Sequence, residues 1–214
     1  MGFGKLTKGM GVQGGPRMLF TGQARTKPVL TVELIPRTTW AKNLRSLVEQ
    51  EVWDVLRKQA YRKARYKCEV CSGRGPKWPV ECHERWSFDR TTRIQTLDGL
   101  IALCPDCHAV KHWGFSRTQG KEAECRDHLA FVNGWSQKQI DQHLEEMFDR
   151  WKDRSRIQWD IDLTVLSTGY GISRDVVGEL YRGRRGAIVS PELAPDEYAG
   201  PEEVPWDDIP EECL

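Results

Sequence analysis

Two Cys-x-x-Cys pairs, Cys68/Cys71 and Cys104/Cys107, constrain this chain more than any other feature of its sequence. Each pair presents two thiols from one tight turn, and four such thiolates suit a closed tetrahedral zinc site. A disulfide framework is the alternative, but the 7 cysteines are odd in number and no charged-then-apolar signal segment opens the chain. We therefore predict that these four cysteines hold a structural Zn²⁺ in a protein of the reducing cytoplasm.

Three histidines near these pairs predict a second metal site. His83 lies between the two pairs, while His108 and His112 follow the second pair. If the segment after Cys104 is helical, His108 and His112 are four residues apart and share one helix face. Together with His83 from a preceding strand, they would form an open, three-ligand site for a catalytic divalent ion, which could be Mg²⁺, Mn²⁺ or Zn²⁺.

Charge is divided unevenly along the chain, although the formal net charge is only +1. Residues 1–67 contain fourteen Lys or Arg and four acids, whereas residues 187–214 contain nine acids and neither Lys nor Arg. A basic half attracts phosphates, so we expect a nucleic acid as partner. Because no run of ~18 apolar residues is present, we expect no association with a membrane.

Composition and periodicity divide the chain into five predicted segments. They are a flexible basic arm (1–27), a strand and basic helix packed on the core (28–66), the metal-bearing core (67–114), a helical and edge-strand extension (115–186) and a disordered acidic tail (187–214). A chain of 214 residues is long enough for one substantial core, with or without a small satellite.

Local patterns predict the main elements of these segments. Proline is tolerated in a first helical turn, so a helix is expected to begin at Cys104-Pro105. Four further elements are a strand at 29–35 ended by Pro36, one helix from about 43 to 66, a strand at 80–86 and a loop at 97–99.

The extension has its own signals. Ser136-x-x-Gln139 is a capping box that predicts the start of a helix, and His143 on the apolar face of this helix is expected to pack rather than bind metal. Alternation at 159–166 predicts an edge strand, and Ser173 is expected to cap a helix ending at Gly183. His128 and Cys125 are interpreted as packing or surface residues.

The metal motifs resemble the zinc-knuckle branch of the HNH, or ββα-metal, endonucleases. The likeness covers roughly residues 66–114 and rests on three stretches, Cys68-Glu-Val-Cys71, Glu81-Cys82-His83-Glu84 and Cys104-Pro-Asp-Cys107-His108-Ala-Val-Lys111-His112. It implies an α+β fold whose ββα-metal core is stapled by the four-cysteine zinc site, with flanking helices. It also implies a metal-dependent endonuclease that hydrolyses nucleic acid, with DNA as the favoured substrate and a phage or mobile element as its setting.

In that family, two adjacent residues of the first strand supply a metal ligand and the general base, and a helix histidine completes the site. One reading here makes His83 the ligand and Glu84 the base; the other makes Cys82 the ligand and His83 the base. We favour the first, because a neutral imidazole at position 83 joins those of His108 and His112. The resemblance thus implies that His83, Glu84 and His108 are catalytic.

One departure from the family concerns the residue that orients the base. The family has an asparagine in the loop before the second cysteine pair, which would fall near Gly99. The general base would therefore be oriented by Asp98, by Gln95 or by a backbone carbonyl, or no residue would orient it.

Two function classes remain open. A nuclease is favoured by His108 and His112, which a purely structural zinc knuckle would not need, whereas the missing asparagine favours a non-catalytic zinc-containing module that binds nucleic acid. Phosphate contacts are predicted at four basic residues, Arg62, Lys63, Arg65 and Lys111. The stretch 204–210 is similar to the acidic tips of bacterial single-stranded-DNA-binding proteins, which suggests a protein partner for the tail.

Overall fold

The computed structural model describes residues 27–40 and 42–182, and it shows a mixed α+β fold. Its elements, in chain order, are η1 (Arg37–Thr39), α1 (Leu44–Leu47), α2 (Gln50–Lys63), β1 (Glu81–Asp89), β2 (Ile94–Leu103), α3 (Pro105–Lys111), α4 (Trp113–Thr118), α5 (Glu122–Asn133), α6 (Gln137–Arg154), β3 (Asp160–Asp162), α7 (Val165–Gly169) and α8 (Arg174–Arg182). The predicted α+β class is confirmed.

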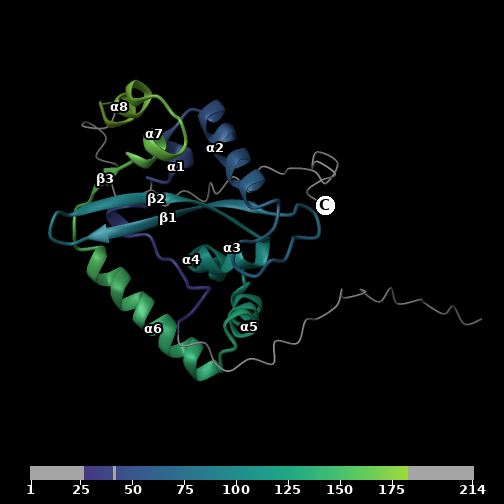
Figure 1. The fold of residues 1–214 in the computed structure, drawn as a ribbon. Helices are drawn as coiled ribbons and strands as arrows, with labels where there is room; N and C mark the ends of the chain where they lie inside the picture. Colours follow the sequence, from purple (N-terminus) through teal and green to yellow (C-terminus); the bar gives the residue numbers. More distant parts are fainter. Residues whose placement is uncertain (1–26, 41, 183–214) are drawn as a thin grey trace, which may run out of the picture.

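A small sheet lies between two groups of helices (Figure 1). β1 pairs antiparallel with β2, and the short β3 joins the other edge of β2 in parallel orientation. Helices α1, α2, α7 and α8 lie on one side of the sheet, while α3, α4, α5 and α6 lie on the other. The chain passes directly from β2 into α3, so the end of the hairpin and the start of this helix are fixed together.

Each side of the sheet has its own hydrophobic core. One core packs Leu56 of α2 and Leu166 of α7 against Leu97 and Ala102 of β2. The other packs Leu103 of β2 against residues of α3, α4, α5 and α6 and contains three of the four motif cysteines. Since β2 contributes to both cores, it is the element that holds the two helical layers together.

The stretch 97–99 is a β-bulge inside β2, so the predicted loop there is wrong. The pairing register shifts between Arg85 and Trp86, where β2 has one residue more than β1. Gly99 adopts φ +146, a conformation that favours glycine. The backbone N–H of Leu100 donates to the hydroxyl of Tyr170 at 2.6 Å, which satisfies a donor that the bulge displaces.

The apolar segment 29–35 forms no strand, contrary to its β-branched composition. Side chains satisfy its backbone instead: Asn133 Oδ1 accepts from the N–H groups of Val29 and Leu30, at 3.0 and 3.1 Å, and Asn133 Nδ2 donates to Leu30 O. Val32 N–H donates to Nε2 of His143 at 3.1 Å. The segment is therefore held against α5 and α6 rather than in the sheet.

Two further expectations are corrected by the described structure. The helix expected from 43 to 66 is divided into α1 and α2, because Val48 adopts an extended conformation. The edge strand expected at 159–166 is limited to β3, after which the chain turns into α7.

Other local predictions are confirmed. α3 begins at Pro105, with Cys104 as its N-cap, and Ser136 and Gln139 form the capping box of α6. His143 packs at the core, and the Ser173 hydroxyl accepts from Val176 N–H at the start of α8.

Several expectations fall on residues outside the described ranges. They concern nearly all of the basic arm, the acidic tail and the helix end at Gly183. Within the described part of the chain, none of the helices combines the length and the apolar composition needed to cross a bilayer.

Candidate metal centres

Two groups of metal-ligating side chains form in the described structure, one of four cysteines and one of three histidines. The sulfur atoms of Cys68, Cys71, Cys104 and Cys107 all lie within 4.8 Å of one another, and those of Cys71 and Cys104 are 3.5 Å apart. Zinc–sulfur bonds of about 2.3 Å in a tetrahedron would place sulfurs about 3.8 Å apart. The six cysteines that the structure describes are free thiols. The cluster therefore fits a metal ion.

Local backbone geometry prepares both cysteine turns for thiolates. The N–H groups of Cys71 and Gly73 point at Sγ of Cys68 and Cys71, and the N–H of Cys107 points at Sγ of Cys104, all at 3.4–3.5 Å. Such N–H···S contacts stabilise negative sulfur. Without a metal ion, hydrogen bonds from Cys104 and then Cys107 lower the pKa of Cys68 to about 6 and also lower the pKa of Cys71, whereas the pKa values of the two donor thiols are raised.

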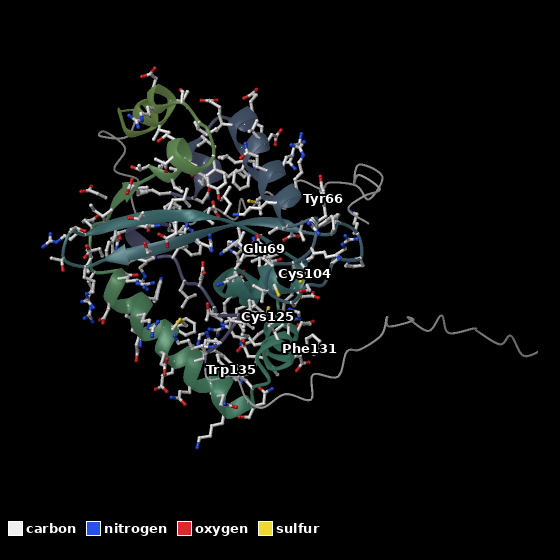
Figure 2. All side chains as sticks on the ribbon, in the orientation of Figure 1. Tyr66, Glu69, Cys104, Cys125, Phe131 and Trp135 are labelled. Carbon is white, nitrogen blue, oxygen red and sulfur yellow. The ribbon has the colours of Figure 1, made fainter. Side chains whose placement is uncertain are left out.

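The first cysteine turn is joined to the end of β2. The Glu69 N–H donates to Ala102 O, and the Ala102 N–H donates to a Glu69 carboxylate oxygen, each at 2.9 Å. Figure 2 shows Cys104 where β2 meets α3, so this pairing brings Cys68 and Cys71 to the second cysteine pair. Gly75 permits the approach, because a Cβ there would lie 2.2 Å from Trp78 O and 2.6 Å from Pro105 Cδ.

His128 is a member of this centre that the sequence did not reveal. Its Nε2 lies 3.1 Å from Sγ of Cys107, from a position on α5 twenty-one residues further along the chain. The imidazole can donate a hydrogen bond to a metal-bound thiolate, which would orient the thiolate of Cys107 and stabilise its charge. Cys125, on the same helix, is 2 % exposed and packs in the core.

The second group brings His83 of β1 together with His108 of α3 and His112, the C-cap of that helix. Nε2 of His112 lies 3.2 Å from Nδ1 of His83 and 3.0 Å from Nε2 of His108. In a tetrahedral site with bonds of about 2.0–2.1 Å, nitrogen ligands lie about 3.3–3.4 Å apart. The three nitrogens therefore already have nearly the spacing of three ligands of one metal ion.

Two carboxylates fix which nitrogens face this point. Nε2 of His83 bonds to Oε2 of Glu33 at 2.9 Å, and Nδ1 of His108 bonds to Oε2 of Glu81. A carboxylate only accepts, so each of these outer nitrogens carries the proton and the inner nitrogens present lone pairs. Nε2 of His112 can donate a hydrogen bond to only one of these inner nitrogens. At least one close pair of nitrogens therefore has no proton between them, so their lone pairs repel each other. A bound cation removes this repulsion.

Burial keeps the helix imidazoles neutral, the form that binds metal. Burial lowers the pKa of His108, against the opposing effect of Glu81, and burial together with the neighbouring histidines lowers the pKa of His112 well below its ordinary value. The carboxylates are held ionised. Burial would raise the pKa of Glu33, but its interactions with His83 and then Lys111 outweigh burial and lower this pKa to about 2.

A small cavity of about 50 Å³ opens beside His83 and His112. Glu84, Gln95 and Lys111 also line it, so three groups predicted or considered for the site meet there. Oε1 of Glu84 accepts from the backbone N–H of Leu44 at 3.0 Å. Gln95 is 1 % exposed, and its Oε1 has no hydrogen-bond partner among the described residues. Asp98, also considered as an orienting residue, instead accepts from the Ser87 hydroxyl.

The other candidates lie in different surroundings. Lys111 is 9 % exposed, and its ammonium binds Glu33 at 2.6 Å and the Thr31 hydroxyl at 3.2 Å. Cys82 lies in the core on the α2 side, apart from the histidines, and burial raises its pKa. The three remaining candidates are exposed at the end of α2 and just beyond it: Arg62, Lys63 and Arg65.

Glu33 and Glu81 are the site residues that sequence reasoning missed. Glu81 precedes the Cys-His-Glu tripeptide, and strand alternation places it on the same face as His83, so a period of two could have identified it. Glu33 gave no such signal, because it lies fifty residues before His83 in a segment that forms no strand. Comparison with known proteins adds nothing to these observations: no family model, curated protein or solved structure matches this chain.

Proposed function

We propose that this protein is a divalent-metal-dependent endonuclease that hydrolyses phosphodiester bonds of nucleic acid, with DNA as the favoured substrate. The observation that carries the proposal is the convergence of the His83, His108 and His112 nitrogens, with carboxylates behind two of them, beside a separate four-cysteine cluster. A cluster of four cysteines is a closed structural site, whereas three protein ligands leave a position open for substrate. The two groups thus have the ligand sets of a structural and a catalytic metal.

The arrangement of elements supports the likeness to the ββα-metal endonucleases. An antiparallel strand pair, β1 and β2, leads directly into α3, and the three histidines come from the first strand and the helix. The same short helix has Cys104 as its N-cap. One rigid unit would therefore hold both metals, so loss of the structural ion would disturb the reactive one.

The site residues would divide the reaction between them. A divalent ion held by the three histidines would supply positive charge to the phosphate and the leaving oxygen. Glu33 and Glu81 hold the His83 and His108 rings with their inner nitrogens toward the ion. Glu84 would accept a proton from the attacking water, and Gln95, whose Oε1 is without a partner, could bind the hydrogen of that water.

The assignment of Glu84 as base agrees with the surroundings of its neighbour. For His83 to be the base, Cys82 would have to be the ligand, but the thiol of Cys82 is buried in the core on the α2 side and has a raised pKa. Glu84 projects from the same face of β1 as Cys82, but it lines the cavity beside His83. We also propose that three exposed basic residues contact the nucleic-acid backbone: Arg62, Lys63 and Arg65.

A non-catalytic zinc module that binds nucleic acid is the second candidate. It is favoured by the internal partners of two proposed functional groups, because Glu84 accepts from Leu44 N–H and Lys111 is bound by Glu33. In this reading the histidine group would be a second structural site.

Cleavage assays separate the two candidates. The zinc-loaded protein is incubated with plasmid, single-stranded DNA and RNA in the presence of Mg²⁺, Mn²⁺ or EDTA. We expect cleavage that depends on the divalent ion and disappears in His83→Ala and His108→Ala. Both variants should keep their zinc and most of their affinity for nucleic acid. His143→Gln, which changes a buried histidine outside the group, should retain cleavage. A wild-type protein that binds nucleic acid but cleaves none would establish the binding module instead.

A second comparison tests the base. Glu84→Gln keeps the size of the side chain and removes its proton acceptor, so it should be inactive, whereas Cys82→Ser should be close to normal. The reverse pattern would make His83 the base.

A further inference from the structure

A second cavity, of about 160 Å³, adjoins the histidine site. The two cavities share three lining residues, Glu33, Ile35 and Trp86, so they border each other at these side chains. The second cavity lies between β1, the segment 31–35 and the C-terminal half of α6. At ~30 Å³ per water it has room for several waters or for a planar ring.

The walls of this cavity alternate aromatic rings and guanidinium groups. We call it the arginine groove and define it by Trp86, Phe88, Arg150, Trp151 and Arg154. The Arg154 guanidinium lies 4.2 Å above the Phe88 ring centroid, and the indole N–H of Trp151 donates to Ile35 O at 2.9 Å. The Trp151 ring is thus fixed before any ligand binds.

The charge of the arginine groove is only partly offset internally, because Glu33 is the carboxylate that lines the cavity and its two oxygens bind His83 and Lys111. Among residues 27–40 and 42–182, no carboxylate lies within ion-pair distance of Arg150 or Arg154. The acids closest in sequence on α6 have other partners, since Asp149 binds Lys152 and Asp153 lies 3.7 Å from both Arg90 and Arg156. Burial and then the nearby charge of Arg150 lower the pKa of Arg154, and an anion bound between them would relieve both effects.

Aromatic faces interleaved with unpaired arginines are the chemistry that binds single-stranded nucleic acid. Arg154 lies over the Phe88 ring and Arg37 lies over the Trp151 ring, so we assign stacking of the base to Trp86. The phosphate would meet the guanidinium of Arg150 or Arg154. A paired base inside a duplex cannot offer its face to such a wall. Trp40, which is 50 % exposed and lines the histidine cavity, adds another ring.

We propose that the arginine groove binds the unpaired nucleotide next to the phosphodiester at the histidine site, so that the substrate is a single-stranded nucleic acid. This inference rests on the proposed function for the position of the scissile bond. The binding of an unpaired nucleotide rests only on the groove itself.

The test compares binding of a fluorescein-labelled DNA strand and of its duplex to the full-length, zinc-loaded protein without added divalent ion. Arg150→Gln/Arg154→Gln should weaken binding of the strand by at least ~10-fold and change duplex binding little. The slope of the logarithm of affinity against the logarithm of salt concentration should become shallower by roughly 1.4 units, which is about 0.7 for each lost phosphate contact. The matched control is Lys152→Gln/Arg156→Gln, which removes two exposed charges of the same region that do not line the cavity.

Two additional readouts keep the test decisive if the double variant is unstable. Arg150→Gln alone changes an exposed side chain and should still weaken binding of the strand more than Lys152→Gln does. Trp86→Leu should reduce the quenching of a 2-aminopurine base placed in the strand, because stacking on the indole ring is lost.

The inference would be overturned if the groove variants lost equal affinity for strand and duplex, or if the control variants lost as much affinity as the groove variants. The endonuclease proposal would still stand. A wild-type protein without cleavage, whose binding of the strand nevertheless depends on Arg150 and Arg154, would overturn the endonuclease proposal and leave the groove as a binding site.

Discussion

At the scale of single residues, the histidine site depends on side chains that never touch the proposed metal. Glu33 holds His83 through one oxygen and Lys111 through the other, so one carboxylate determines the orientation of a ligand and neutralises a buried ammonium. Glu81 likewise orients the ring of His108. This support explains how two buried imidazoles and one partly buried imidazole can face one point before a cation is bound.

The change Glu33→Gln tests this support. The amide keeps the size of the side chain but loses the charge, so we expect the affinity of the histidine site for Mn²⁺ or Zn²⁺ to fall about 10-fold to 100-fold. Zinc at the four cysteines should be unaffected. Isothermal titration of the zinc-loaded protein measures the change, and Glu146→Gln on the exposed face of α6 is the control. If Glu33→Gln and the wild type bound Mn²⁺ or Zn²⁺ at the histidine site with equal affinity, the role given to Glu33 in this site would be wrong.

Gly75 provides a residue-scale test of the cysteine centre. Gly75→Ala places a methyl group 2.2 Å from a backbone oxygen and 2.6 Å from the Pro105 ring, so the first cysteine turn must move away from the second. We expect faster loss of zinc to a chelator and a melting temperature lower by several degrees. Gly114→Ala, in open surroundings 3.9 Å from Leu34, should behave like wild type. If Gly75→Ala lost zinc to the chelator at the same rate as the wild type, the close approach of the two cysteine turns at Gly75 would be contradicted.

At the scale of elements, sequence patterns succeeded where a local rule determines the structure. Cys104-Pro105 marked the start of α3 because Pro105 needs no hydrogen-bond partner for its nitrogen in the first turn, and the reciprocal bonds of Ser136 and Gln139 begin α6. The i, i+4 spacing of His108 and His112 followed from that helix. These features need only the residues next to them in the chain.

The same patterns failed where distant partners decide the conformation. Segment 29–35 has the composition of a strand, but Asn133 and His143, more than one hundred residues later, satisfy its backbone. Glu33 enters the histidine site only because of that docking. A turn signal at Gly99 was real, yet its partner Tyr170 turned it into a bulge within β2.

The docking of this segment on α6 should depend on pH. His143 accepts the Val32 N–H through a ring nitrogen, and burial lowers its pKa below the ordinary 6.5. As pH falls below about 6.5, the unfolded chain binds a proton that the folded chain resists, so the free energy of unfolding should decrease. Urea denaturation at a series of pH values measures it. His143→Gln, which can accept the same bond without titrating, should show a smaller decrease, and an identical decrease would contradict the role given to His143.

At the scale of the whole molecule, the cysteine centre lies where β2, α3 and α5 meet. Three of its four cysteines belong to the core that also contains Trp113 and Leu129, so this ion would join the sheet to one helical layer. Structural zinc supplies on the order of 10 kcal/mol of folding free energy in small domains. We therefore expect Cys104→Ser to lose both zinc and the fold of this layer.

Tryptophan fluorescence follows that loss, because Trp113 is 1 % exposed in the folded protein and its emission should shift to longer wavelength. Cys125→Ala changes a buried cysteine outside the cluster and should keep the zinc. A metal-free Cys104→Ser protein with native fluorescence and an unchanged melting temperature would show that the cluster does not stabilise the fold.

The proposed chemistry requires that one chain hold two distinct metal ions, one enclosed by cysteines and one open at the histidines. Native mass spectrometry of the full-length protein, first after dialysis against EDTA and then after titration with Mn²⁺ or Zn²⁺, counts them directly. We expect the wild type to retain one zinc through dialysis and then to bind one further ion, while His108→Ala retains the zinc and binds no second ion. A second ion bound equally well by His108→Ala, or a wild type that binds only one ion, would contradict the assignment of two metal centres.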